Sequence, residues 1–114
     1  MQMNLAVRRL SALAHDRRLE VFRLLVKAGP SGMAAGEIAR RLSMPANTLS
    51  AQLLILANSE LLRARRDGRS IIYTVQSDAM RDLLIFLTED CCRGNPQICM
   101  PAVKSPARAR QKAP

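Results

Sequence analysis

The residues with the most distinctive chemistry in this chain of 114 residues are its three cysteines, Cys91, Cys92 and Cys99, which lie within nine residues of one another. An odd number of thiols in a chain without an export signal argues against a structural disulfide framework. The N-terminal stretch MQMNLAVRRL has no apolar run of signal-peptide length, so we expect a cytoplasmic protein. In a reducing compartment, clustered thiols are candidate ligands for a soft ion or candidate redox groups.

The chain is strongly basic, because 18 Lys and Arg residues against 9 Asp and Glu residues give a net charge of +9. Part of this charge lies in a Pro- and Ala-rich C-terminal tail, which is expected to be disordered. The rest of the chain is still cationic, which favours nucleic acid as the partner. With no Trp, one Tyr and two Phe, a base-stacking platform for single strands is not expected. The apolar runs are short and interrupted by charge, so we expect no membrane span.

Two short helices joined by a tight turn are predicted in the segment 35–56. Their apolar residues recur with helical period, as Ala35, Ile38 and Leu42 and then as Leu49, Leu53 and Leu56. The opposite face of the second helix carries short side chains rather than the Lys and Glu of a solvated face: Asn47, Thr48, Ser50, Ala51 and Gln52. This pattern is typical of a helix-turn-helix whose second helix enters the major groove, where Gln can pair with adenine edges. A helical hairpin with a solvated face is the alternative.

The next segment, LLRARRDGRSIIYTV, predicts two strands around Asp67-Gly68, a favoured two-residue hairpin turn. Four arginines flank this turn: Arg63, Arg65, Arg66 and Arg69. A hairpin tip rich in Arg, directly after a helix-turn-helix, is the layout of a wing that follows the DNA backbone or minor groove. We expect base or phosphate contacts from Asn47, Thr48, Ser50 and Gln52, and backbone contacts from Arg65, Arg66 and Arg69.

Helices are also predicted before and after this unit. The earlier part of the chain carries Leu10 and Leu13, then a stripe of Leu19, Val21, Phe22, Leu25 and Val26 that ends at Gly29-Pro30. Ser77 can cap a last helix in which Met80, Leu84 and Leu87 align at helical spacing. The apolar stripes of the first and last helices are wide for so short a chain, so we expect these two helices to form a dimer interface.

The order of these elements resembles the ArsR/SmtB family of bacterial winged-helix repressors, over about residues 5–90. The segments that carry the resemblance are ALAHDRRLEVFRLL at 12–25, GEIARRLSMPANTLSAQLLIL at 36–56 and LLRARRDGRSIIYTV at 61–75. The resemblance implies a homodimer that represses its own operon and releases DNA when a metal or metalloid binds. No enzymatic activity is implied.

Two of the family's metal sites have no counterpart in this chain. Ala34 and Gly36 stand where some arsenic and cadmium sensors of the family carry a Cys-x-Cys pair. The zinc sensors use His and carboxylates on the last helix, whereas the single histidine here, His15, is expected in the first turn of the second helix. What remains is Cys91-Cys92-x6-Cys99, which resembles the site of a subgroup that binds trivalent arsenic just past the last helix.

Three thiolates suit trivalent arsenic, because this soft ion makes three bonds and keeps a lone pair on its fourth side. Zinc in structural sites and iron–sulfur clusters usually take four ligands, so the chain is one ligand short for either. We therefore expect As(III), or the similar Sb(III), as an inducer held by Cys91, Cys92 and Cys99, with no cofactor required. Four alternatives remain open: buried filler thiols, a regulatory disulfide in a redox-sensing repressor, Cd, Pb or Zn sensing, and an arsenite carrier without DNA binding.

An enzyme is not expected. Cysteine-based arsenate reductases and phosphatases need Cys-x5-Arg, and the motif fails for each cysteine, because the required position holds Gln97, Ile98 or Ser105. The sequence thus predicts a mainly α winged helix-turn-helix fold of about five helices and a two-stranded hairpin wing. We divide the chain into a DNA-binding and dimerisation domain at 1–90, a metalloid-binding segment at 91–101 and a disordered basic tail at 102–114. The expected function is arsenic-responsive repression of an arsenic-resistance operon, through an inverted repeat in double-stranded operator DNA bound by a homodimer.

Overall fold

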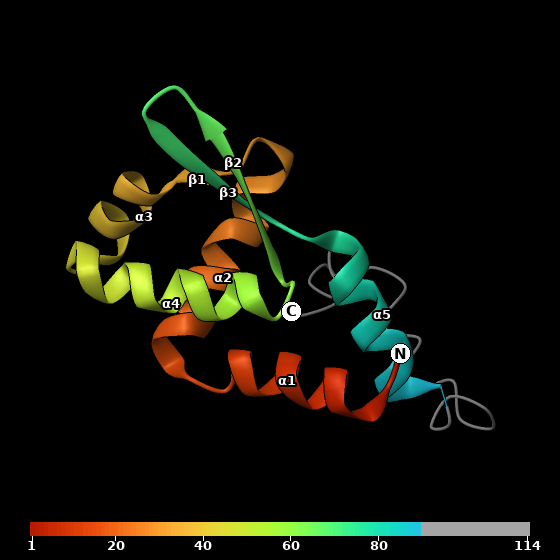
Figure 1. Cartoon of the computed structure of the whole chain (residues 1–114). Helices are drawn as coiled ribbons and strands as arrows, with labels where there is room; N and C mark the ends of the chain where they lie inside the picture. Colours follow the sequence, from red (N-terminus) through yellow and green to blue (C-terminus); the bar gives the residue numbers. More distant parts are fainter. Residues whose placement is uncertain (90–114) are drawn as a thin grey trace, which may run out of the picture.

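The computed structural model describes residues 1–89, so the three cysteines and the basic tail lie outside the described residues. Figure 1 shows five α-helices and a small sheet within this part of the chain. The elements follow in the order α1 (Met3–Leu13), α2 (Asp16–Ala28), the 3-10 turn η1 (Gly29–Ser31), β1 (Met33–Ala34), α3 (Ala35–Leu42), α4 (Ala46–Asn58), β2 (Leu62–Asp67), β3 (Ser70–Val75) and α5 (Ser77–Thr88). The winged helix-turn-helix fold predicted from the sequence is confirmed.

The hydrophobic core lies where α2, α3 and α4 meet the base of the hairpin. Its fully buried side chains include Val21 and Leu25 from α2, Ile38 from α3, and Leu53 and Leu56 from α4. Removing this apolar surface from water is the main term that holds the three helices together. The inward stripes predicted for α3 and α4 are therefore confirmed.

The stripe predicted for α2 is partly wrong. Val21, Phe22 and Leu25 are buried, whereas Leu19 is 42% exposed and Val26 is 54% exposed. In a helix these two residues point about 100° away from the buried line, and the neighbouring elements cover only one side of α2. The last helix also begins differently from the prediction, since Gln76 occupies the N-cap position of α5 and no side chain caps it.

The sheet has three strands instead of the predicted two, in the order β1-β3-β2. The short β1 pairs antiparallel with β3, with Met33 opposite Tyr73 and Ala34 opposite Ile72. Gly32 leads into β1 with φ +70°, and a Cβ atom there would lie 2.5 Å from the Tyr73 carbonyl oxygen. Only glycine therefore lets the chain come close enough to β3 to add this strand.

The hairpin turn lies one residue later than predicted. Asp67 pairs with Ser70 as the last rung of the β2–β3 ladder, so the two central residues of the turn are Gly68 and Arg69. Gly68 has φ +64°, whereas the φ of Arg69 is not positive. Glycine at the first central position alone is the pattern of a type II′ turn, which matches the twist of the flanking strands.

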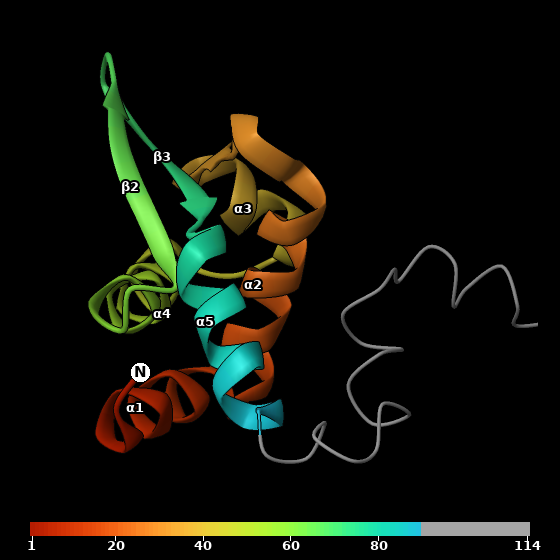
Figure 2. The same ribbon diagram turned by 90° about the vertical axis from the view of Figure 1, so that its right-hand side faces the viewer.

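The helices and the hairpin lie on two sides of the molecule. In Figure 2 the hairpin, α4 and α1 lie toward the left of the view, and α2 lies toward the right, with α5 between them. The hairpin extends well beyond the helices at its tip. Among residues 1–89, no helix is long and apolar enough to cross a membrane.

Candidate nucleic-acid interface

The turn between α3 and α4 fixes the angle at which α4 is presented. Ser43 adopts a left-handed conformation with φ 51°, and its amide N–H donates to the Arg40 carbonyl at 3.3 Å. The Met44 amide N–H then donates to the Ala39 carbonyl at 2.9 Å, which closes the end of α3. A serine in this conformation is strained compared with glycine, and the paired hydrogen bonds hold it there. Pro45 follows at the N-cap position of α4, where its missing N–H costs nothing.

The exposed face of α4 carries short side chains, as the sequence predicts. Asn47, Thr48, Ser50 and Ala51 are all exposed, while Leu49 and Leu53 on the opposite face are buried. Short side chains let a helix approach base edges closely in the major groove. The structure thus provides the surface that the predicted contacts of Asn47, Thr48 and Ser50 require, although the contacts themselves stay predictions.

Leu54 belongs to the same face and was not identified from the sequence. It is 61% exposed and follows Asn47 and Ala51 at helical spacing. An apolar side chain on a helix that enters the major groove can contact the methyl group of thymine. The spacing of seven residues from Asn47 is the signal that could have revealed it.

Gln52 lies differently from its polar neighbours on α4. It is half-buried, and its Oε1 accepts a hydrogen bond from Arg18 Nη1 at 3.1 Å. Arg18 lies in the first turn of α2, so this bond joins α4 to α2. The predicted base contact of Gln52 has to be compatible with this partner.

The wing carries positive charge on both faces and at its tip. Arg65 and Arg66 are consecutive residues of β2, so their side chains point to opposite faces of the hairpin. Arg69 lies in the turn. All three are exposed, as is Arg63 at the base of the hairpin. None of these four arginines forms an ion pair with any residue in the described part of the chain. Their charge is therefore available for DNA phosphates.

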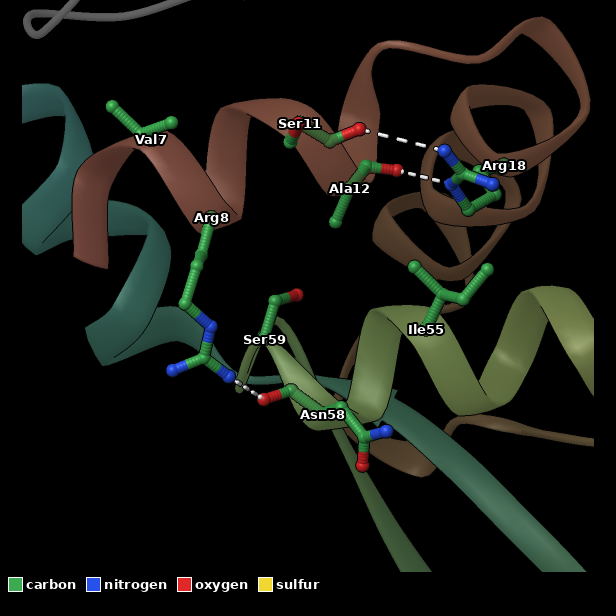
Figure 3. A pocket seen from close by; sticks show the side chains of 8 residues that line it. All are labelled: Val7, Arg8, Ser11, Ala12, Arg18, Ile55, Asn58 and Ser59. Atoms are coloured by element: carbon green, nitrogen blue, oxygen red, sulfur yellow. Dashed lines mark hydrogen bonds between the residues drawn. The ribbon is translucent and has the colours of Figure 1, made fainter. Parts of the chain in front are cut away.

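A shallow groove of about 420 Å³ runs between α1 and α4 (Figure 3). Two arginines line it: Arg8 Nη2 donates to the Asn58 carbonyl at 2.6 Å, and Arg18 Nε donates to the Ala12 carbonyl at 2.6 Å. Each bond satisfies a carbonyl at the C-terminal end of a helix, where the helix dipole also favours a positive charge. The Arg8 bond thus joins α1 to α4, and the Arg18 bond joins α2 to α1.

The described residues contain no group of three or more His, Cys, Asp or Glu side chains that could hold a metal ion. The Nδ1 atom of His15 accepts from the Arg18 amide N–H at 3.5 Å, so His15 caps the N-terminus of α2. This places it just before α2, one residue earlier than the first helical turn predicted for it. Cys91, Cys92 and Cys99 lie outside residues 1–89.

Comparisons with known proteins agree with this geometry. Residues 13–65 match the family model described as "Helix-turn-helix domain". NolR from Sinorhizobium fredii is 34% identical, with a TM-score of 0.61, and the match covers 75% of this chain and 83% of NolR. HlyU from Vibrio cholerae is 30% identical, with a TM-score of 0.60 and coverage of 76% and 97%, and it has also been solved in a form described as reduced.

A third relative carries the family name. It is the domain Mb0332 from Mycobacterium bovis, described as homodimeric, winged helix-turn-helix and DNA-binding, and as a possible ArsR-family transcriptional regulator. It is 28% identical to this chain, with a TM-score of 0.64 and coverage of 82% of this chain and 84% of that chain. Of these relatives, HlyU is named a transcriptional activator and Mb0332 is described as a possible transcriptional regulator. By fold, helix-turn-helix match and sequence identity, this chain belongs to the ArsR/SmtB family of winged helix-turn-helix transcription regulators.

Proposed function

We propose that the chain binds an inverted repeat in double-stranded operator DNA as a homodimer, with α4 in the major groove and the wing along the backbone. The observation that carries this proposal is the combination of a small, polar, exposed face on α4 with exposed arginines on the adjacent hairpin. Base edges are read from the groove, and phosphate contacts supply most of the affinity and its dependence on salt. Two-fold symmetry of the protein requires two half-sites, about 34 Å apart or a multiple of that distance.

The apolar surfaces of α1 and α5 support the proposed homodimer. Met3 and Val7 on α1 are 67% and 54% exposed, and Ile85 on α5 is 54% exposed. Leu10, Leu84 and Leu87 add to these surfaces with exposures of 37% to 44%. A small domain gains stability by removing such surface from water, and a second copy offers the same surface in return. The M. bovis relative is described as homodimeric, which supports a homodimer here as well.

For the signal that controls DNA binding, we propose As(III), or Sb(III), held by the thiolates of Cys91, Cys92 and Cys99. The support comes from the sequence: three clustered thiols match the three bonds of the ion. The first of them follows α5 closely, since this helix ends at Thr88. Binding there would rearrange the segment after α5, shift the dimer interface and change the spacing or tilt of the two reading helices. The ion must bind the DNA-free form more tightly, because equal affinity for both forms would move nothing.

A thiol-based redox switch is the second candidate for the signal. It is favoured by the three clustered thiols of this chain and by a V. cholerae relative that has been solved in a form described as reduced. In this chain a disulfide from Cys91 or Cys92 to Cys99 would release two electrons and two protons to an oxidant such as a peroxide. The disulfide would then act through the same helix, but without an ion.

Release of operator DNA tests the two signals side by side. With a reductant present, arsenite should release the wild-type protein from DNA, whereas peroxide without arsenite should leave it bound. The opposite pattern would support the redox switch. Expression of a reporter gene under the operator decides the direction of control: we propose repression, so deletion of the regulator should raise expression.

A further inference from the structure

Gln52 is tied to a guanidinium that is itself immobilised. Arg18 Nη1 donates to Gln52 Oε1 at 3.1 Å, while Arg18 Nε and Nη2 donate to the carbonyls of Ala12 at 2.6 Å and Ser11 at 3.4 Å. Figure 3 shows the two bonds from Arg18 to the end of α1. With these carbonyls holding it, the guanidinium cannot turn away from α4 without leaving polar groups of α1 unsatisfied.

The chemistry of this contact fixes which way the Gln52 amide faces. A guanidinium has N–H donors and no acceptor, so the amide group must present its oxygen to Arg18. Flipping the amide would set its NH₂ group against the N–H groups of Arg18, donor against donor. The amide oxygen is therefore engaged, and the two amide hydrogens remain for another partner.

Helix geometry places these hydrogens near the DNA-binding surface. Gln52 follows Thr48 by one helical turn, so the two residues share a face of α4. Long side chains in a helix lean toward its N-terminus, which brings the head of Gln52 over the turn that carries the exposed Thr48. In helix-turn-helix proteins, the N-terminal residues of the reading helix are those that contact base edges.

We propose that Gln52 offers DNA only its amide hydrogens, so that it selects guanine and disfavours adenine at the base pair it reads. Guanine presents two acceptors in the major groove, O6 and N7, which two hydrogens can satisfy. Adenine presents the N7 acceptor beside the N6 donor, and its bidentate pairing with Gln needs the amide oxygen, which the bond from Arg18 holds on one lone pair and keeps turned toward α2. The inference rests on the proposed function, and it reverses the adenine preference that the residue type alone suggests.

The experiment measures affinity for operator DNA in which each base pair is replaced in turn by the other three. The Gln52→Ala variant identifies the base pair that Gln52 reads, because its preference there is relaxed. At that position we expect the wild-type protein to prefer guanine over adenine by about tenfold. Gln52→Glu keeps an acceptor for Arg18 but has no hydrogens to donate, so the guanine preference should disappear.

Two further variants keep the outcome interpretable. Gln2→Glu makes the same change of charge at the exposed N-cap of α1, and it should retain the guanine preference. If Gln52→Glu does not fold, Gln52→Met has a similar length and no amide, and it should lose the preference as well. A preference for adenine at the relaxed position, or no position relaxed by Gln52→Ala, would overturn the inference. A wild-type protein that binds no DNA specifically would instead refute the proposed function.

Discussion

Arg9 on the buried face of α1 and Glu60, two residues past the end of α4, form an ion pair at 2.8 Å. Only 5% of the Arg9 side chain is exposed, and its Nε and Nη1 atoms also donate to the carbonyls of Ser59 at 3.1 Å and Ala79 at 3.0 Å. One guanidinium thus joins α1 to the end of the reading helix and to the first turn of α5. Glu60 has φ +67°, in the left-handed region that closes the end of α4 and that usually holds glycine.

The first prediction separates the two halves of this pair. Arg9→Leu should lower the free energy of unfolding by on the order of 3 kcal/mol, because two buried carbonyls lose their donors. Glu60→Gly should be close to neutral, since glycine relieves the left-handed strain and the side chain of Glu60 is 66% exposed. Urea unfolding at one fixed protein concentration measures both. A Glu60→Gly variant as unstable as Arg9→Leu would show that the carboxylate, and not the carbonyls, requires Arg9.

The second prediction concerns the wing. Arg66→Ala should weaken binding to all DNA sequences alike and should reduce the slope of log affinity against log salt by about 1, as expected for one lost phosphate contact. The matched control is Arg23→Ala, the same change at an exposed site on α2, outside both α4 and the hairpin. Titration of DNA at three or more salt concentrations gives both slopes. Equal slopes for the two variants would remove Arg66 from the interface.

The third prediction uses two leucine substitutions to separate dimerisation from DNA binding. Leu84→Glu on α5 should yield a monomer that binds operator DNA weakly, because the charge would be buried between two copies. Leu54→Glu on α4 should remain dimeric but lose DNA affinity, because the new negative charge would enter a groove lined by negative phosphates. Light scattering after size-exclusion chromatography gives the mass of each variant. A dimeric Leu84→Glu protein would place the interface elsewhere.

The fourth prediction concerns the cysteines. Changing Cys91, Cys92 or Cys99 singly to Ser should leave a regulator that binds operator DNA but no longer releases it with arsenite. To take DNA occupancy from 99:1 to 1:99, arsenite must prefer the DNA-free form about 10⁴-fold, which three As–S bonds can supply. Truncation after Pro101 should preserve both binding and release, with some loss of nonspecific affinity.

Fluorescence anisotropy of labelled operator DNA follows binding and release in one titration. If all three Ser variants still release DNA at wild-type arsenite concentrations, the thiols are not the site. If the variants fail to bind DNA at all, the thiols have a structural role.

The sequence predicts the elements of this fold well where period and burial coincide. Leu49, Leu53 and Leu56 recur at helical spacing and are buried, because one face of α4 packs against the core and the other is exposed. Prediction fails where packing between elements decides whether a side chain is buried. Leu19 belongs to an apolar stripe and is therefore expected to be buried, yet it is 42% exposed. Likewise, β1 has only two residues, and its pairing depends on the close approach of Gly32 to β3, which no local pattern reveals.

The candidate site shows the same division. Exposure of Asn47 and Thr48 and the charge of the wing follow from local pattern, so the sequence predicts them. The orientation of Gln52 depends on Arg18, which is 34 residues away in the chain, and only the packing of α2 against α4 brings the two together. Long-range hydrogen bonds of this kind are set by the fold as a whole and leave no periodic signal.

We propose above all that a dimer of this chain binds DNA specifically through α4 and the wing. The most direct measurement is a gel shift with the protein's own upstream DNA, with the wild-type protein, Arg66→Ala and Leu54→Glu run in parallel and with unrelated DNA as competitor. We expect one retarded band that contains two protein chains on an inverted repeat, resists the competitor and is weakened by either substitution. A wild-type protein that gives no retarded band, or a band that the competitor removes as readily as the operator does, would contradict this proposal.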